Sequence, residues 1–228
     1  MRALAAVLCG LAGLPVGWFL TLLIERVPDK QPVMAGARPG LPEKPRDRVV
    51  VVVSVVLLAA AGARFFDSWA LPGYLLLFSV LLAVSVIDLD HFRIPNRIVY
   101  PSLLASVPLL ALAALFDDDW DGLREAAIGA LIAFGFLLVV HLIHPRGMGF
   151  GDVKLAALLG LYLGWLGLGF VPLGLFLGFF LGAVIGVGLM VVGHKNRKDP
   201  IPFGPFLAAG AVIAVLLGDP ILDWYLGV

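Results

Sequence analysis

The run Leu155–Gly193 holds 39 residues without a single charged side chain. As one α-helix it would be about 58 Å long at about 1.5 Å per residue. That is nearly twice the ~30 Å hydrocarbon core of a bilayer, which about twenty apolar residues cross. The run therefore predicts two membrane spans, and we expect the break between them near Gly167–Pro172.

Composition extends this prediction to the whole chain. Of its 228 residues, 61% are hydrophobic and 14% are charged, whereas soluble domains have about 25% charged residues. We predict an integral membrane protein of the all-α class, because lipid offers the backbone no hydrogen-bond partners. We expect one domain over 1–228, since no polar segment is long enough for a second. A formal net charge of zero gives no reason to expect nucleic acid.

Apolar runs of about twenty residues predict a polytopic bundle of about eight transmembrane helices. The first run follows Arg2 and lacks a small-x-small cleavage site, so we interpret it as a retained span. Polar connections lie at Glu25–Arg48, Asp117–Arg124 and His194–Lys198. The predicted spans are Ala3–Ile24, Val49–Phe66, Leu71–Ile87, Ile98–Phe116, Glu125–Ile143, the two within Leu155–Gly193, and Ile201–Leu217.

The basic residues predict the orientation. If the first long loop lies inside, every Lys and Arg falls on the inner side except Arg2, Arg64 and Arg124. This distribution satisfies the positive-inside rule. It predicts termini that face outward, and it places Asp88 and Asp152 on the cytoplasmic side.

A glycine-rich stretch before the long apolar run is the first candidate site. Gly147, Gly149 and Gly151 precede Asp152. Glycine costs about 1 kcal/mol per helical position relative to alanine, and it lets two backbones approach closely. An acidic residue at membrane depth indicates a functional site. The alternative is that Asp152 caps the next helix, which would leave the three glycines unexplained.

Asp88 ends the third span and Asp152 begins the sixth, at the same edge of the membrane. Two neighbouring carboxylates in a poorly solvated place cannot both ionise easily, so one keeps a proton while the other is a base. Aspartic proteases use such a pair to activate water and protonate the leaving amine. The alternative is two unrelated interfacial residues, and spacing alone does not decide. If both act on one water, we expect the two carboxyl groups to open onto one cytoplasmic-side cavity.

For the other polar residues we expect roles outside the catalytic chemistry. Lys154 can neutralise a carboxylate or a lipid phosphate, or extend to the interface. His141 and His144 lie on one helix face but lack a third ligand, and Cys9 is the only cysteine. We therefore expect no metal and no cofactor. Pro95 ends the turn after the third span. Interfacial solvation is expected for Asp90, His91, Arg93 and Arg97.

Together these residues resemble type IV prepilin peptidases, which are membrane aspartic peptidases with a Gly-x-Gly-Asp motif. Gly149–Asp152 matches that motif. Ile87–Asn96 resembles the segment with the family's first catalytic aspartate, six residues before the Ile of Ile-Pro, which implies Asp88 here. Ile201–Phe206 resembles the motif of the family's last span.

The N-terminal part departs from this family. Gly17–Pro28 resembles the family's N-terminal motif only partly, with Thr21 where an Asn is usual. Many bacterial members carry a larger cytoplasmic domain with two Cys-x-x-Cys pairs, and they also methylate the processed pilin. The short loop Glu25–Arg48 stands in its place and has no cysteine, so we expect no zinc and leave methylation open.

The resemblance implies an aspartic endopeptidase of the bacterial inner membrane that cleaves the leader from a prepilin or pseudopilin at the cytoplasmic face. Its expected partners are this substrate and the lipid bilayer. The alternatives are a proton-coupled transporter that uses the same carboxylates, a bifunctional peptidase and N-methyltransferase, and a non-catalytic scaffold. The predicted site residues are the catalytic Asp88 and Asp152, with Gly149, Gly151, Lys154 and Pro95 binding substrate or shaping the site.

Overall fold

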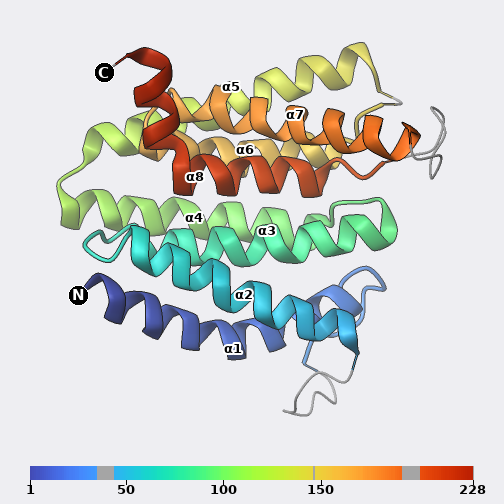
Figure 1. Ribbon diagram of the computed structural model, residues 1–228, viewed down its shortest axis with the longest axis horizontal. Coiled ribbons are helices and arrows are strands. Elements are labelled where there is room, and N and C mark those ends of the chain that lie inside the picture. The colour runs from blue at the N-terminus through green and yellow to red at the C-terminus, as the bar shows by residue number, and fades with distance from the viewer. Residues whose placement is uncertain (35–43, 146, 192–200, 228) are drawn as a thin grey trace. The chain divides into compact units, whose positions relative to one another are not determined.

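The structure is a computed structural model that describes residues 1–34, 44–145, 147–191 and 201–227. Over these residues it contains helices and no strand (Figure 1), which confirms the predicted all-α class. The basic loop His194–Lys198 and Arg146 lie outside the described residues. The helices are α1 (Arg2–Arg26), α2 (Pro45–Arg64), α3 (Leu71–His91), α4 (Asn96–Asp117), α5 (Trp120–Ile143), α6 (Phe150–Leu166), α7 (Phe170–Val191) and α8 (Gly204–Leu226).

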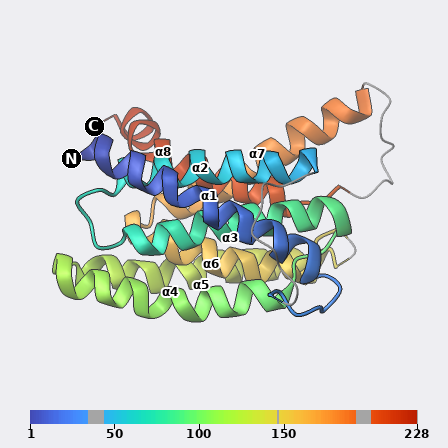
Figure 2. The ribbon, with the colours of Figure 1, turned by 90° about the horizontal axis from the view of Figure 1, so that it is seen from below.

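The break predicted in the long apolar run is confirmed. α6 ends at Leu166, and α7 begins at Phe170. Gly167 follows α6 with φ 131°, a backbone conformation that side chains rarely adopt. The Oε2 atom of Glu125 accepts the Leu168 N–H at 3.2 Å. The start of α5 therefore holds the turn between α6 and α7 (Figure 2).

Six of the helices are long and apolar enough to cross a membrane: α1, α3, α4, α5, α7 and α8. The protein is therefore consistent with a multi-pass helical membrane protein. α2 does not meet this condition because three charged residues, Arg46, Asp47 and Arg48, lie in its first turn. α6 does not meet it because its 17 residues span only about 25 Å, which is shorter than the hydrocarbon core. Spans two and six remain predictions.

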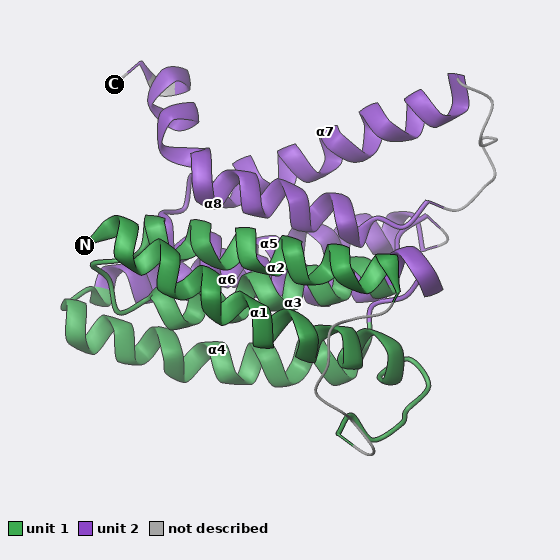
Figure 3. Cartoon of the chain, turned by 60° about the horizontal axis from the view of Figure 1, so that its bottom comes forward, with its two compact units in different colours: residues 1–87, 95–120 green, residues 88–94, 121–228 purple. Residues whose placement is uncertain are grey.

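Contacts divide the chain into two compact units, which Figure 3 colours separately. Unit 1 comprises Met1–Ile87 and Pro95–Trp120, and unit 2 comprises Asp88–Ile94 and Asp121–Val228. The last turn of α3 thus belongs to unit 2, whereas the rest of that helix belongs to unit 1. The single domain expected over residues 1–228 stays a prediction.

In unit 1, small residues let α1 and α2 pack closely. A Cβ built on Gly13 would lie 2.6 Å from the Val55 Cα, and one on Gly17 would lie 2.8 Å from the Val51 Cα. Two glycines four residues apart on one helix face are typical of close packing between membrane helices. Side chains larger than hydrogen therefore do not fit at these positions of α1.

In unit 2, α6 is the central helix, and most of its residues are buried. Gly160 of α6 meets the backbone of Gly129 on α5. Gly210 of α8 meets Gly178 of α7 in the same way, with 2.7 Å between its Cβ position and the Gly178 Cα. These close approaches pack α6 against α5 and α8 against α7 within unit 2.

Candidate active site

The start of α6 holds Asp152 in place. Gly149 is the N-cap residue, and its N–H donates to Asp152 Oδ2 at 3.2 Å. The Asp152 N–H donates back to the Gly149 carbonyl at 3.1 Å. The Asp152 side chain is buried, with the residue 7% exposed. The capping role considered from the sequence is therefore present, with Asp152 three residues after the cap.

Asp88 lies in the last turn of α3, which continues to His91 rather than ending at Ile87 as predicted. Phe92 terminates the helix with φ 52°, and its N–H donates to the Asp88 carbonyl at 2.9 Å. The Asp88 residue is 5% exposed. Its Oδ2 accepts the backbone N–H of Gly204, the first residue of α8, at 3.0 Å.

Ile94 lies against both helix starts. A Cβ built on Gly151 would be 2.8 Å from the Ile94 Cβ, and one built on Gly204 would be 3.2 Å from the Ile94 Cδ1. The second Cβ would also be 2.8 Å from Asp88 Oδ2. The backbone next to Asp152 and the amide that binds Asp88 therefore touch the same side chain. All of these residues belong to unit 2.

This arrangement gives both carboxyl groups the same kind of support. Each accepts a hydrogen bond from a backbone N–H at a helix N-terminus, where unpaired N–H groups and the helix dipole favour negative charge. Burial acts in the opposite direction, because it disfavours a charged carboxylate. Two buried acids held in this way can exchange protons with a water or an amine placed between them.

Two cavities lie within unit 2. A cavity of about 390 Å³ is lined by Met148, Phe179, Phe203 and Phe206 among others. A second, of about 370 Å³, lies between α5 and α7. Neither of these two is lined by Asp88 or Asp152, and the shared cytoplasmic-side cavity expected from the sequence stays a prediction.

Comparison with known proteins decides the family. A model described as the type IV leader peptidase family matches residues 75–187. A prepilin leader peptidase/N-methyltransferase of Bacillus subtilis (strain 168) is 36% identical over 177 residues, which cover 77% of this chain and 67% of that protein. The chain belongs to the type IV leader peptidase family.

Other members of the type IV leader peptidase family are similar over slightly more of this chain. A prepilin leader peptidase/N-methyltransferase of Aeromonas hydrophila is 36% identical over 186 residues, 81% of this chain and 63% of that protein. One of Pseudomonas aeruginosa is 35% identical over 179 residues, 78% of this chain and 60% of that protein. The chain thus spans less than two thirds of the length of these two relatives. No solved structure matches this chain.

Both aspartates fall within the residues that the family model matches, whereas Gly204 lies beyond them. The sequence singled out Asp88, Asp152, Gly149 and Gly151. It gave no individual role to Ile94 or Gly204, although both lie in segments that resemble family motifs. A Gly-Pro pair at the predicted start of the last span was the available signal for Gly204.

The two remaining predicted site residues lie beside this group in sequence. The Lys154 ammonium lies 4.8 Å from the centre of the Phe150 ring, one turn earlier on α6. Pro95 is the N-cap residue of α4 and directly follows Ile94, but contacts assign it to unit 1. Their roles in binding substrate or shaping the site remain predictions.

His141, one of the two histidines considered as metal ligands, has a structural explanation. His141 Nδ1 lies 2.8 Å from the Met148 carbonyl oxygen, and its ring lies 5.5 Å from that of Phe150. The His141 ring therefore fixes the loop that leads into α6. Within the described part of the chain, no three His, Cys, Asp or Glu side chains gather as a metal site would require.

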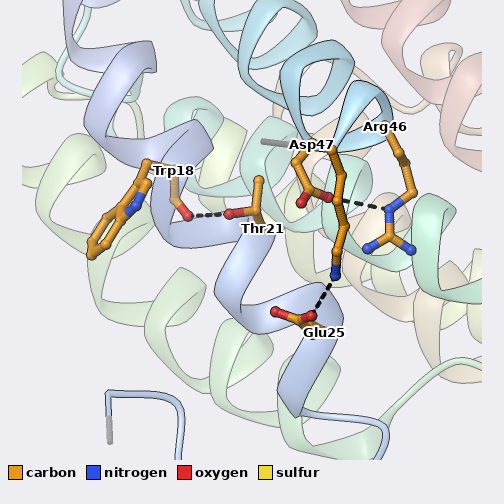
Figure 4. Close-up of polar contacts among 6 residues, drawn as sticks. Trp18, Thr21, Glu25, Arg46 and Asp47 are labelled. Carbon is orange, nitrogen blue, oxygen red and sulfur yellow. Dashed lines mark hydrogen bonds and ion pairs between the residues drawn. The ribbon is translucent and has the colours of Figure 1, made fainter. Parts of the chain in front are cut away.

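The N-terminal segment was expected to match the family only in part. The Thr21 hydroxyl donates to the Trp18 carbonyl of its own helix at 2.7 Å (Figure 4). Glu25, at the end of α1, pairs with Lys44 at 2.7 Å, and at the start of α2 Arg46 pairs with Asp47 at 3.2 Å. The Glu25 pair joins the two ends of the first loop, whose residues 35–43 lie outside the described part.

Proposed function

We propose that this protein is an aspartic endopeptidase that removes the leader from prepilin-like proteins, with Asp88 and Asp152 as its catalytic pair. One observation carries the proposal. Two buried aspartates from distant motifs accept hydrogen bonds from backbone N–H groups at the starts of α8 and α6. Both helix starts contact the same isoleucine, Ile94. They occur in a chain of the type IV leader peptidase family, whose relatives are named for prepilin leader cleavage.

The chemistry follows from one shared proton. One carboxylate takes a proton from water, and the hydroxide formed adds to the carbonyl carbon of the scissile peptide bond. The second carboxyl group, which starts protonated, gives its proton to the leaving nitrogen as the C–N bond breaks. The products are a new carboxyl terminus on the leader and a new amino terminus on the pilin. No metal or cofactor takes part in this scheme.

The location of the site is part of the proposal. Asp88 lies in the last turn of α3 and Asp152 in the first turn of α6. An odd-numbered helix that ends and an even-numbered helix that begins meet at the same membrane face when all helices cross. The basic loops indicate that this face is cytoplasmic. We therefore propose cleavage at the cytoplasmic edge of the bacterial inner membrane.

Asparagine substitutions test the pair. Asp88→Asn and Asp152→Asn each keep an oxygen that can accept the Gly204 or Gly149 N–H, so the helix starts stay capped. The amide cannot exchange a proton, so we expect cleavage to fall by at least about 10³-fold in either variant. The assay follows the size of a prepilin-like protein after incubation with the enzyme in liposomes.

Asp90→Asn is the matched control, because Asp90 is an exposed carboxylate two residues after Asp88. It should cleave within about twofold of the wild type, as expected for a surface substitution. Cleavage at the wild-type rate by Asp88→Asn or Asp152→Asn would refute the pair. Mass spectrometry of the new amino terminus, with a methyl donor present, would show whether the second activity in the relatives' names is present too.

A further inference from the structure

We infer that Gly204 and Ile94 are positioning residues for this aspartate pair: the α8 amide of Gly204 orients Asp88, and Ile94 sets the spacing between the starts of α6 and α8. The inference rests on the proposed function. It assigns a role in the reaction to the Ile201–Phe206 segment, whose resemblance to a family motif carried no role from the sequence. It also gives one reason for glycine at two separate places in the chain.

The role of Gly204 rests on two contacts. Its N–H lies in the first turn of α8, where backbone donors have no acceptor within the helix. The Gly204 N–H donates instead to the Asp88 carboxylate at 3.0 Å. Hydrogen bonds to a charged acceptor are stronger than neutral ones. The second contact is steric, because a Cβ at this position would lie 2.8 Å from the same oxygen. Only glycine gives Asp88 both the donor and the room to reach it.

Ile94 connects the two halves of the pair. Its Cδ1 faces Gly204, and its Cβ faces Gly151, the residue before Asp152. The Cβ of isoleucine is a branched carbon bonded directly to the backbone, so this atom cannot move without moving the chain. Any shift of Ile94 therefore changes the start of α6 and the start of α8 together. The side chain acts as a spacer, because catalysis requires the two carboxyl groups at one fixed separation.

Gly204→Ala is the first test. The new methyl group displaces the Asp88 carboxyl group, and we expect kcat to fall on the order of 10–100-fold, as for a displacement of about 1 Å. KM should stay within about twofold of the wild type, because neither residue is assigned to substrate binding. Gly135→Ala on α5 is the control, since its Cβ would meet nothing within 4 Å. It should leave both constants unchanged.

A backbone substitution separates the donor from the steric effect. Glycolic acid in place of Gly204, introduced by nonsense suppression in cell-free synthesis, replaces the N–H with an oxygen and adds no side chain. We expect kcat to fall roughly tenfold, as for the loss of a hydrogen bond to a charged group. Ile94→Val removes the Cδ1 that faces Gly204, so in the Gly204→Ala background it should restore part of the lost kcat.

These outcomes can be told apart from failure of the proposed function. If the wild type does not cleave prepilin-like proteins, the peptidase and this inference both fall. If the wild type cleaves and Asp88→Asn does not, but the glycolic acid variant keeps the wild-type kcat, only the inference is overturned. A Gly204→Ala loss expressed in KM, or one that Ile94→Val deepens instead of relieving, would also overturn it.

Discussion

The three glycines before Asp152 differ in what an added methyl group would meet. A Cβ on Gly147 would have no atom nearer than 3.5 Å, one on Gly149 would lie 3.3 Å from Asp152 Oδ2, and one on Gly151 would lie 2.8 Å from the Ile94 Cβ. We predict that alanine substitutions lower kcat in this order, with Gly147→Ala near the wild type. Gly149→Ala should lose several-fold, and Gly151→Ala should lose at least about tenfold, because the rigid Ile94 cannot yield.

Initial rates and KM of the three variants would be measured in one lipid composition, with the amount of inserted protein as normalisation. Equal activity of Gly147→Ala and Gly151→Ala would contradict the series. It would mean that the contact between Gly151 and Ile94 does not bear on the pair. A loss in Gly151→Ala without a loss of inserted protein is the expected result.

Sequence patterns could predict the residues that carry chemistry but not what holds them. Asp152 follows a glycine-rich motif, and Asp88 stands at a fixed distance before an Ile-Pro pair, so both could be named. The partner of Asp88 is a backbone N–H 116 residues away. A backbone donor is the same in every residue except proline, so no residue type marks it. The contact of Ile94 with two glycines likewise depends on packing between distant segments.

Among the helices, the pair α1 and α2 gives the sharpest prediction about stability. The Gly13 Cβ position is 2.6 Å from a backbone atom of Val55, so Gly13→Ala must push the two helices apart. We expect the free energy of unfolding to fall by about 1–3 kcal/mol, the usual cost of overpacking. Thermal unfolding in detergent, followed by the fluorescence of a thiol-reactive dye on Cys9, would measure it.

Gly188→Ala on α7 is the control for this substitution, because its Cβ would meet nothing within 4 Å. It exchanges the same residue in a helix of similar length, where alanine favours the helix by about 1 kcal/mol. A Gly13→Ala variant as stable as the wild type would show that α1 and α2 do not pack as closely as the structure has them.

The helices could be predicted more accurately than their ends. Hydrophobic length marks the part of a helix that fits a bilayer, and over the described residues each predicted span overlaps a helix of the structure. The span Val49–Phe66 runs past the end of α2 at Arg64, however, and the span Ile201–Leu217 starts before α8 does at Gly204. The helix itself stops only where the backbone changes. α3 continues past Ile87 until Phe92 turns left-handed, and α8 continues to Leu226 with Pro220 inside it. The predicted spans stop at Ile87 and Leu217 because polar residues follow, but neither the acidic residues after Ile87 nor Pro220 ends its helix.

For the whole molecule, the assignment of Asp88–Ile94 to unit 2 has a consequence for the site. The segment that carries Asp88 and Ile94 makes its contacts with α6 and α8 residues of the same unit. The complete candidate pair therefore lies within one compact unit. Hydropathy could not predict this, because it marks α3 as one continuous span.

Membrane orientation is the prediction that concerns the whole chain. The positive-inside rule places the turn after α3 in the cytoplasm and the turn between α4 and α5 on the opposite side. Asp90 lies in the last turn of α3, directly before the first of these turns, and Asp118 lies in the second; both are exposed. In a Cys9→Ser background, Asp118→Cys should react with a membrane-impermeant maleimide in intact spheroplasts. Asp90→Cys should react only after the membrane is permeabilised.

Cys9→Ser alone is the control for background labelling, and an uncharged permeant maleimide shows that each new thiol can react. The reverse pattern, with Asp90→Cys labelled in intact spheroplasts, would place the aspartate pair outside. Leader cleavage would then have to occur on the far side of the membrane, although the basic loops favour the cytoplasm. Labelling of both positions from one side would instead mean that an odd number of helices between them does not cross the membrane. Since Asp90 and Asp118 are separated by α4 alone, that result would remove α4 from the spans and with it the agreement of the charges with eight crossings.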